Sequence, residues 1–345
     1  MLFHSLTLLG HSLPNFLTIF LAHGYLAVDL FFVLSGFVIY LSYHAGLTNS
    51  TASNVSKFYW NRLARIYPVH FVMLIGYLFL YLAFQLYSDS GTAPESYTWS
   101  AFFQSLFLIH MWVGTELTWN VPSWSISSEW FVYLFFPLMA VSLRKIRNSP
   151  SVSLLAIAAV AALLGTLYKW MDVASLGSEI PRMALIRTML EFLMGVFIGS
   201  LFVNHRSTLE KYRSVGLGGF LVLVALYISL DLPDYTVIPI SFALLIAYLS
   251  VSTDWLAALL SRPSLVYLGE ISYSTYMVHY LVYDLLKAMF MSNSNVINPV
   301  HVWLSFAVVL ALSILLHHGV DAPAQRYIRR WTSRNTASGR YPSKG

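Results

Sequence analysis

The chain has 345 residues, of which 57% are hydrophobic and only 10% are charged. A soluble domain carries about 25% charged residues, so the composition excludes an ordinary soluble protein. The 20 Lys and Arg residues outnumber the 15 Asp and Glu residues. Because these basic residues are scattered between apolar segments, we interpret them as determinants of membrane topology and not as a surface that binds nucleic acid. Because the chain has no cysteine, disulfides, a thiolate metal site and an acyl-cysteine intermediate are excluded.

Apolar segments recur along the whole length, which predicts an all-α, polytopic membrane protein with about ten transmembrane helices. Residues 1–12 are too few to cross a bilayer, because a span needs roughly 17 to 25 residues, so the first helix is expected to be partial. The span at 24–40 carries one carboxylate, Asp29. It also has a small-residue step at Ser35 and Gly36, where another helix can approach closely.

Two segments are not expected to cross the membrane. Residues 58–68 are basic and aromatic, which is typical of an interfacial helix, and the run 100–112 is short enough to be half-inserted. All spans belong to one transmembrane domain, 1–331, followed by a polar tail at 332–345 that is expected to be disordered. The remaining spans are predicted at 69–88, 124–142, 151–168, 185–203, 215–230, 236–252, 264–287 and 301–318.

The basic residues predict the orientation of these spans. If the loop around Lys57 is cytoplasmic and the spans alternate, most of the 20 Lys and Arg residues fall on the inner side. This distribution predicts a multi-pass protein of a bacterial inner membrane with both termini in the cytoplasm. Within the predicted span 185–203, Arg187 and Glu191 are spaced i, i+4 and are expected to form an intrahelical ion pair. The basic residues outside or near the outer surface are Lys169, Arg182, Arg187 and Lys287.

Several ionisable residues are predicted at similar depth in the outer half of the membrane. From the helical rise, Asp29 lies roughly 8 Å below the outer boundary, Glu129 roughly 9 Å and His279 roughly 12 Å. His4 joins them if the first span is real. A histidine there can take a proton from a hydroxyl and return it to a thiolate, with Asp29 or Glu129 fixing its tautomer. The alternatives are a packing histidine bonded to backbone, and His11 as the base.

Two further groups of residues bear on ligand binding. Arg62 and Arg65 are spaced i, i+3 and share a helix face, and paired guanidinium groups suit a polyphosphate. The alternative for this pair is a lipid-headgroup anchor. His317 and His318 are adjacent, so on a helix they point about 100° apart, and no third ligand lies nearby in the sequence, which argues against a metal site.

Five sequence motifs resemble those of the acyltransferase 3 family of membrane proteins. The run VDLFFVLSGF at 28–37 matches V-D-x-F-F-x-x-S-G-F, and WSISSEWFVY at 124–133 is similar to W-S-L-S-x-E-W-x-x-Y. SYSTYMVH at 272–279 is similar to S-Y-x-x-Y-x-x-H, and an R-x-x-R element precedes a proline at 62–68. Residues 2–4, LFH, match the end of the catalytic motif on the first span.

The resemblance implies an O-acyltransferase that moves an acyl group, expected to be acetyl, from acyl-coenzyme A to a hydroxyl of an extracytoplasmic carbohydrate or other acceptor. Acyl-coenzyme A would be a co-substrate, with no cofactor and no metal. The family carries a basic residue eleven positions before the catalytic histidine, which here falls upstream of Met1, so the first span is expected to lack its N-terminal part. The implied residues are His4, Asp29 and Glu129 for catalysis, Arg62 and Arg65 for the donor, and Ser35, Trp124, Ser127, Tyr133, Tyr273, Tyr276 and His279 lining the acceptor pocket.

Two other functions compete with this interpretation. A transporter or flippase of a polar substrate would use the same buried charges, but it normally shows inverted repeats with broken spans in matching positions, and the sequence shows none. A second class of membrane O-acyltransferases also relies on a buried histidine, but it lacks the motif at 28–37. The expected partners are the acyl donor, the hydroxyl acceptor and membrane lipid, without nucleic acid.

Overall fold

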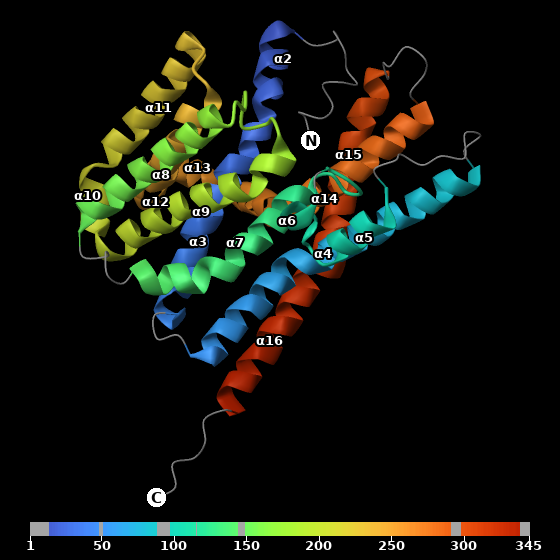
Figure 1. Ribbon diagram of the computed structural model, residues 1–345, viewed down its shortest axis with the longest axis horizontal. Coiled ribbons are helices and arrows are strands. Elements are labelled where there is room, and N and C mark those ends of the chain that lie inside the picture. The colour runs from blue at the N-terminus through green and yellow to red at the C-terminus, as the bar shows by residue number, and fades with distance from the viewer. Residues whose placement is uncertain are drawn as a thin grey trace, which may run out of the picture. The chain divides into compact units, whose positions relative to one another are not determined.

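The computed structural model describes residues 14–47, 51–87, 97–114, 116–143, 149–290 and 298–338, and this part of the chain contains helices and no strands (Figure 1). Within it, eight helices are long and apolar enough to cross a membrane. A further long helix of 28 residues coincides with the predicted span at 264–287. These findings confirm the all-α, polytopic membrane fold. The predicted partial first span, with His4 and His11, lies outside the described residues.

The described helices are divided between two compact units. The first comprises the described parts of Met1–Gly24, Ala52–Ser127 and Pro263–Gly345, and the second comprises those of Tyr25–Thr51 and Ser128–Arg262. The helices are α2 (Asn15–Ala22), α3 (Ala27–Leu47), α4 (Ala52–Tyr87), α5 (Trp99–Leu106), α6 (His110–Val113), α7 (Ser123–Ser142), α8 (Pro150–Trp170), α9 (Ile180–Asn204), α10 (Arg206–Lys211), α11 (Arg213–Leu230), α12 (Asp234–Val251), α13 (Trp255–Leu260), α14 (Pro263–Phe290), α15 (Pro299–Leu316) and α16 (Ala322–Ser338), with short turns η2 (His23–Leu26) and η4 (His317–Asp321).

In the second unit, α3 and α9 run parallel and pack almost backbone to backbone. A Cβ atom on Gly36 of α3 would lie 2.0 Å from the carbonyl oxygen of Phe192, and one on Gly195 of α9 would lie 1.9 Å from that of Val33. Only glycine permits this approach, so the predicted small-residue step is confirmed. Because α3 and α9 run in the same direction, residues near their N-terminal ends lie at the same level.

In the first unit, α4 and α14 also run parallel. The Tyr273 hydroxyl donates to the Ile66 carbonyl, and the Tyr77 hydroxyl donates to Oδ2 of Asp284 at 3.2 Å. The residue number rises from the first contact to the second in both helices, so the two helices point in the same direction. The predicted alternation of spans also gives these two helices the same direction. From α15 the chain returns in the opposite direction, and α16 lies along the N-terminal half of α4 (Figure 1).

Two predicted boundaries differ from the structure. The predicted interfacial helix at 58–68 and the span at 69–88 form one continuous helix, α4, which passes through Pro68. A proline inside a membrane helix is tolerated where neighbouring groups compensate for its missing N–H. The tail was predicted to be disordered from residue 332, but α16 continues to Ser338. The Trp331 ring of α16 packs edge-on against Trp60 of α4, with centroids 5.4 Å apart.

The run 100–112 forms the short helices α5 and α6, separated by a turn, and not a crossing. Thr98 caps α5, because its side chain accepts a hydrogen bond from the Ala101 N–H at 3.1 Å. Leu108, in the turn between the helices, has a positive φ of 58°. The chain therefore turns between α5 and α6.

Candidate active site

Asp29 forms a buried ion pair with Arg187 in the second unit. Arg187 donates from Nε to Oδ1 of Asp29 at 2.6 Å and from Nη2 to Oδ2 at 2.7 Å, and its Nη1 donates to the Leu176 carbonyl at 2.6 Å. The two side chains are only 0% and 2% exposed. Because Asp29 lies in the first turn of α3 and Arg187 in the second turn of α9, the parallel packing brings them level.

This pairing corrects the expected intrahelical pair of Arg187 with Glu191. The Arg187 guanidinium contacts Asp29 on the neighbouring helix with bidentate geometry, which is stronger than a single contact along one helix. Glu191 is fully buried one turn further along α9, where its carboxyl group interacts electrostatically with both Asp29 and Arg187. The i, i+4 spacing was the one sequence signal that pointed to Glu191, and it gave the wrong partner for Arg187.

Ser35, Glu129 and Tyr133 meet in the second unit, between α3 and α7. The Ser35 hydroxyl donates to Oε1 of Glu129 at 2.5 Å, and it lies 3.2 Å from the Tyr133 hydroxyl. Glu129 and Tyr133 are one turn apart on α7, so both side chains face the same side of that helix. Glu129 is only partly buried. The structure thus brings together three predicted site residues from two motifs that are about 90 residues apart in the chain.

The other two predicted residues of the α7 motif lie at its start, in the first unit. Trp124 is buried, with 6% of its surface exposed. Ser127 is fully buried, and its hydroxyl donates to the Leu108 carbonyl at 2.8 Å and accepts from the Met111 N–H at 3.2 Å. The Ser127 side chain therefore holds the turn between α5 and α6, a role that the sequence motif did not indicate.

Tyr273, Tyr276 and His279 follow one another at i, i+3 and i+6 along one face of α14. Besides bonding α4, Tyr273 lies under Arg65, whose guanidinium carbon is 5.3 Å from the ring centroid. Tyr276 donates to the Pro122 carbonyl at 3.0 Å. His279 is 3% exposed, and its Nδ1 lies 2.6 Å from the Tyr276 carbonyl oxygen. Tyr273 thus joins α14 to α4, and Tyr276 joins it to the start of α7, whereas Nδ1 of His279 contacts a carbonyl oxygen on α14 itself.

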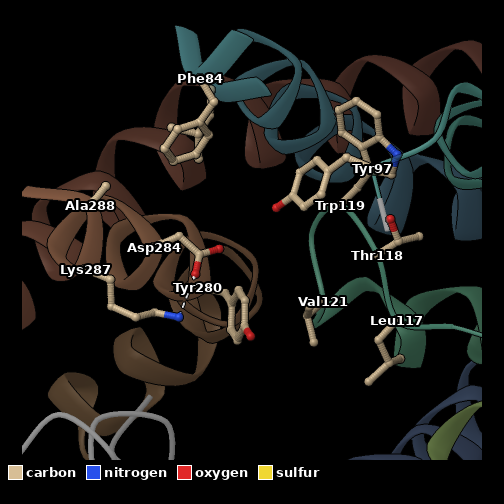
Figure 2. Close-up of a pocket in the computed structure, with 11 residues that line it drawn as sticks. Phe84, Tyr97, Leu117, Thr118, Trp119, Val121, Tyr280, Asp284, Lys287 and Ala288 are labelled. Carbon is tan, nitrogen blue, oxygen red and sulfur yellow. Dashed lines mark ion pairs between the residues drawn. The ribbon is translucent and has the colours of Figure 1, made fainter. Parts of the chain in front are cut away.

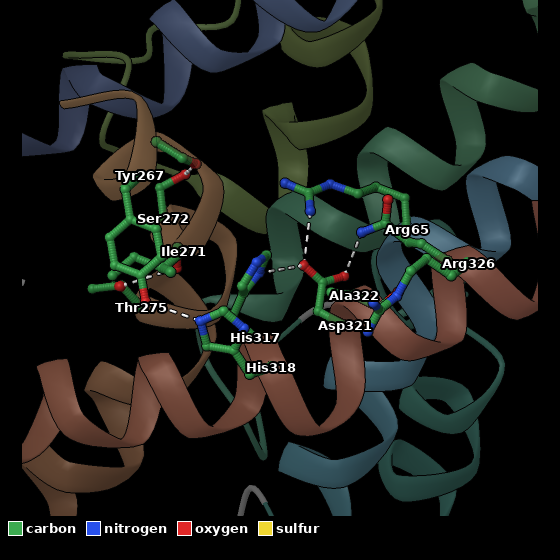
Figure 3. A network of polar contacts seen from close by, with 12 residues as sticks. Arg65, Tyr267, Ile271, Ser272, Thr275, His317, His318, Asp321, Ala322 and Arg326 are labelled. Carbon is green, nitrogen blue, oxygen red and sulfur yellow. Dashed lines mark hydrogen bonds and ion pairs between the residues drawn. The ribbon is translucent and has the colours of Figure 1, made fainter. Parts of the chain in front are cut away.

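Arg65 belongs to a polar network centred on Asp321 (Figure 3). Nη1 of Arg65 lies 2.9 Å from Oδ2 of Asp321, and Gln325 donates to Oδ1 at 2.7 Å. Nδ1 of His317 is 3.3 Å from the same carboxylate, whereas His318 contacts Tyr267 at 3.1 Å. Asp321 is fully buried and ends a π-helical turn, a feature frequent at functional sites. Sequence reasoning missed Asp321, although an acid next to a predicted span was a usable signal.

The short helix α6 carries a buried histidine that stays neutral. Nε2 of His110 lies 3.3 Å from the Ser123 hydroxyl, and only 2% of the residue is exposed. Burial, with a smaller contribution from the nearby His70, lowers the pKa of His110 to about 3. His110 therefore acts as a fixed hydrogen-bonding group at physiological pH, and not as a proton carrier.

Comparison with known proteins shows one family. The model of the acyltransferase 3 family, described as an acyltransferase domain, matches residues 1–318. Acyltransferase MdmB of Streptomyces mycarofaciens is 29% identical over 281 residues, which cover 75% of this chain and 68% of that protein. Exopolysaccharide production protein ExoZ of Rhizobium meliloti (strain 1021) is 28% identical over 293 residues, which cover 81% of this chain and 80% of that protein.

A longer relative matches more of the chain. A putative O-acetyltransferase of Staphylococcus aureus (strain COL) is 24% identical over 337 residues, which cover 89% of this chain and 53% of that protein. The chain thus spans about half the length of this relative. No solved structure matches the chain. Since the family model covers most of the chain and two of these relatives are named as an acyltransferase and a putative O-acetyltransferase, the chain belongs to the acyltransferase 3 family and is an acyl-transferring membrane enzyme.

Proposed function

We propose that this enzyme transfers an acyl group, with acetyl as the expected group, from acyl-coenzyme A on the cytoplasmic side to a carbohydrate hydroxyl on the outer side of a bacterial inner membrane. The observation that carries the proposal is the Ser35–Glu129–Tyr133 cluster, in which a partly buried carboxylate is held between two membrane helices. A carboxylate within a membrane helix is costly, and such residues typically mark a functional site. The names of the ExoZ and O-acetyltransferase relatives support a carbohydrate acceptor and an acetyl group.

In the proposed reaction, the acceptor oxygen attacks the thioester carbonyl, so that a C–O bond forms and the C–S bond breaks. The acceptor proton passes to His4 as general base and then to the departing thiolate of coenzyme A. The imidazolium that forms needs a carboxylate partner. Glu129 suits this role better than Asp29, because both oxygens of Asp29 already accept hydrogen bonds from Arg187.

For the donor, we propose that Arg62 and Arg65 bind the diphosphate of acyl-coenzyme A. The ion pair with Asp321 fixes the position of the Arg65 guanidinium, which is one-third exposed. The return of α16 along α4 adds Arg326, Arg329 and Arg330 to the same end of the first unit. This concentration of positive charge complements a polyphosphate.

The test is an acyl-transfer assay on purified enzyme in lipid vesicles, with radiolabelled acetyl-coenzyme A and an exopolysaccharide acceptor. Glu129→Gln is expected to lower turnover by about 100- to 10,000-fold, which is the range for loss of assisted proton transfer. Ser35→Ala, which removes the hydrogen bond to Glu129, should lower turnover less. His4→Ala is expected to abolish transfer, whereas His11→Ala and His279→Ala should not.

Controls come from exposed residues of the same type. Glu210→Gln removes a carboxylate that pairs with Arg206 on the surface, and Ser42→Ala removes a hydroxyl that only bonds its own helix. Both should retain wild-type turnover. Full activity of Glu129→Gln, or equal losses in Glu129→Gln and Glu210→Gln, would refute the proposed role of Glu129.

A further inference from the structure

A cavity of about 470 Å³ lies in the first unit, between the C-terminal ends of α4 and α14 and the loop that precedes α7 (Figure 2). This volume is within the roughly 300–1,000 Å³ of small-molecule sites. None of the predicted site residues within the described part of the chain lines it. Its polar and aromatic lining includes Phe84, Tyr97, Thr118, Trp119, Tyr280, Asp284 and Lys287.

One wall of the cavity is built from packed aromatic rings. Trp119 is 1% exposed, and its ring centroid lies 4.9 Å from that of Phe102 and 5.1 Å from that of Tyr97. Its indole N–H donates to the Thr98 carbonyl at 3.2 Å. Trp119 also has a positive φ of 51°, which is rare for a bulky residue and persists where the surroundings enforce it, often at ligand sites. The wall is therefore held in place before any ligand binds.

The opposite wall carries a balanced pair of charges. Oδ1 of Asp284 lies 3.4 Å from Nζ of Lys287, and Tyr77 bonds the other carboxylate oxygen. Both charged side chains are partly exposed, at 19% and 32%. Figure 2 shows this pair beside Tyr280 at the edge of the hollow, facing Tyr97 and Trp119. Because the charges cancel, the wall offers donors and acceptors to a ligand without favouring an anion or a cation.

This combination of groups fits a sugar ring. A pyranose has an apolar face of C–H groups, which packs on aromatic rings, and an edge of hydroxyls, which bond carboxylates and ammonium groups. Tyr97 and Tyr280 supply the rings, and Asp284 and Lys287 supply the charged partners. Burial raises the pKa of Tyr97, so its hydroxyl stays protonated and can also donate. In the proposed orientation, the C-terminal ends of α4 and α14 face the outer side, where the acceptor is found.

We propose that this cavity binds a neutral sugar residue of the acceptor, packed against Tyr97 and Tyr280 and hydrogen-bonded by Asp284 and Lys287. The assignment of the sugar to the acceptor rests on the proposed function, whereas sugar binding itself does not. The cavity would hold the acceptor chain while another part of it reacts.

The absence of cysteine allows a direct test of binding. A single cysteine introduced as Ala288→Cys lies in the cavity lining, and Met289→Cys lies next to it on α14 but outside the lining, with 70% of the residue exposed. Each variant, in lipid vesicles, is labelled with a membrane-impermeant maleimide in the presence of methyl glycosides of glucose, galactose and N-acetylglucosamine. At least one glycoside is expected to slow labelling of Ala288→Cys and leave Met289→Cys unchanged.

Two groups proposed to bind the sugar, the Asp284 carboxylate and the Tyr280 ring, are then removed one at a time in the Ala288→Cys variant. Asp284→Asn and Tyr280→Ala should each raise the glycoside concentration needed for protection about tenfold or more, which corresponds to loss of one hydrogen bond to a charged group or of one ring contact. Asp231→Asn and Tyr327→Ala change exposed residues outside the lining and should leave protection unchanged.

Three outcomes would overturn the proposal: no protection by any glycoside, equal protection of Met289→Cys, or protection by inorganic phosphate in place of the glycosides. Labelling does not depend on acyl transfer. If the wild-type enzyme released no thiol from acetyl-coenzyme A while the glycosides still protected Ala288→Cys, the proposed function would fail and the sugar site would stand. If transfer proceeded and no glycoside protected, the sugar site alone would fail.

Discussion

Replacing one partner of the Asp29–Arg187 pair is expected to destabilise the protein strongly. In Asp29→Asn, the guanidinium keeps its place between α3 and α9 but loses the compensating negative charge, and both groups are almost completely buried. Removing one partner of a buried pair costs about 3–5 kcal/mol, because the other charge stays buried without the counter-charge that it was bonded to. Arg187→Met should cost a similar amount, since it leaves the Asp29 carboxylate without its two donors.

The double variant separates a structural role from a catalytic one. Asp29→Leu with Arg187→Met removes both charges and keeps apolar volume, so its stability should recover to within about 1–2 kcal/mol of the wild type. Unfolding free energies of the single and double variants, measured by denaturant titration in detergent, give this comparison. A double variant no more stable than the single variants, or single variants as stable as the wild type, would refute the reasoning.

Turnover per folded molecule completes the test. If Asp29 acts only by joining α3 to α9, the double variant keeps acyl-transfer activity within about tenfold of the wild type. If Asp29 itself orients the catalytic base, as the sequence motif implied, the double variant loses about 100- to 10,000-fold even though it is folded. We expect the first result, because the Asp29 oxygens are bonded to Arg187.

Three further predictions concern the framework. Gly195→Ala should destabilise the protein by at least about 1–3 kcal/mol, because its Cβ would lie 1.9 Å from a carbonyl oxygen, whereas Gly218→Ala, with open space around it, should not destabilise it. Ser127→Ala should cost about 1–3 kcal/mol and expose the α5–α6 segment to proteolysis, because two buried backbone groups lose their partner. The third prediction uses pH. Since the pKa of His110 is about 3 in the folded state and about 6.5 when unfolded, the unfolded state binds more protons between these values. The wild type should therefore lose about 2 kcal/mol of stability from pH 7 to pH 5 through this residue, and His110→Gln should lose correspondingly less; equal losses would contradict the assignment.

The membrane fold could be predicted from the sequence, because a run of apolar residues long enough for the bilayer predicts a span wherever it occurs. The number of such runs also predicted that α3 is parallel to α9 and that α4 is parallel to α14. The small-residue step at Gly36 was also visible, since close helix packing needs a residue without a side chain. The motifs named Ser35, Glu129 and Tyr133, which do meet in space.

Only the tertiary structure decided which polar groups are partners. The local i, i+4 rule paired Arg187 with Glu191. In the structure, the parallel packing of α3 on α9 places Asp29, which is 158 residues away in the sequence, within hydrogen-bond distance of both Nε and Nη2 of Arg187. The same applies to Arg65 and Asp321, which are 256 residues apart. Inside a membrane, a charge takes the partner that best satisfies its hydrogen bonds, and the register between distant helices determines that partner. No local sequence pattern encodes this register, so the pairing emerges only when the helices pack.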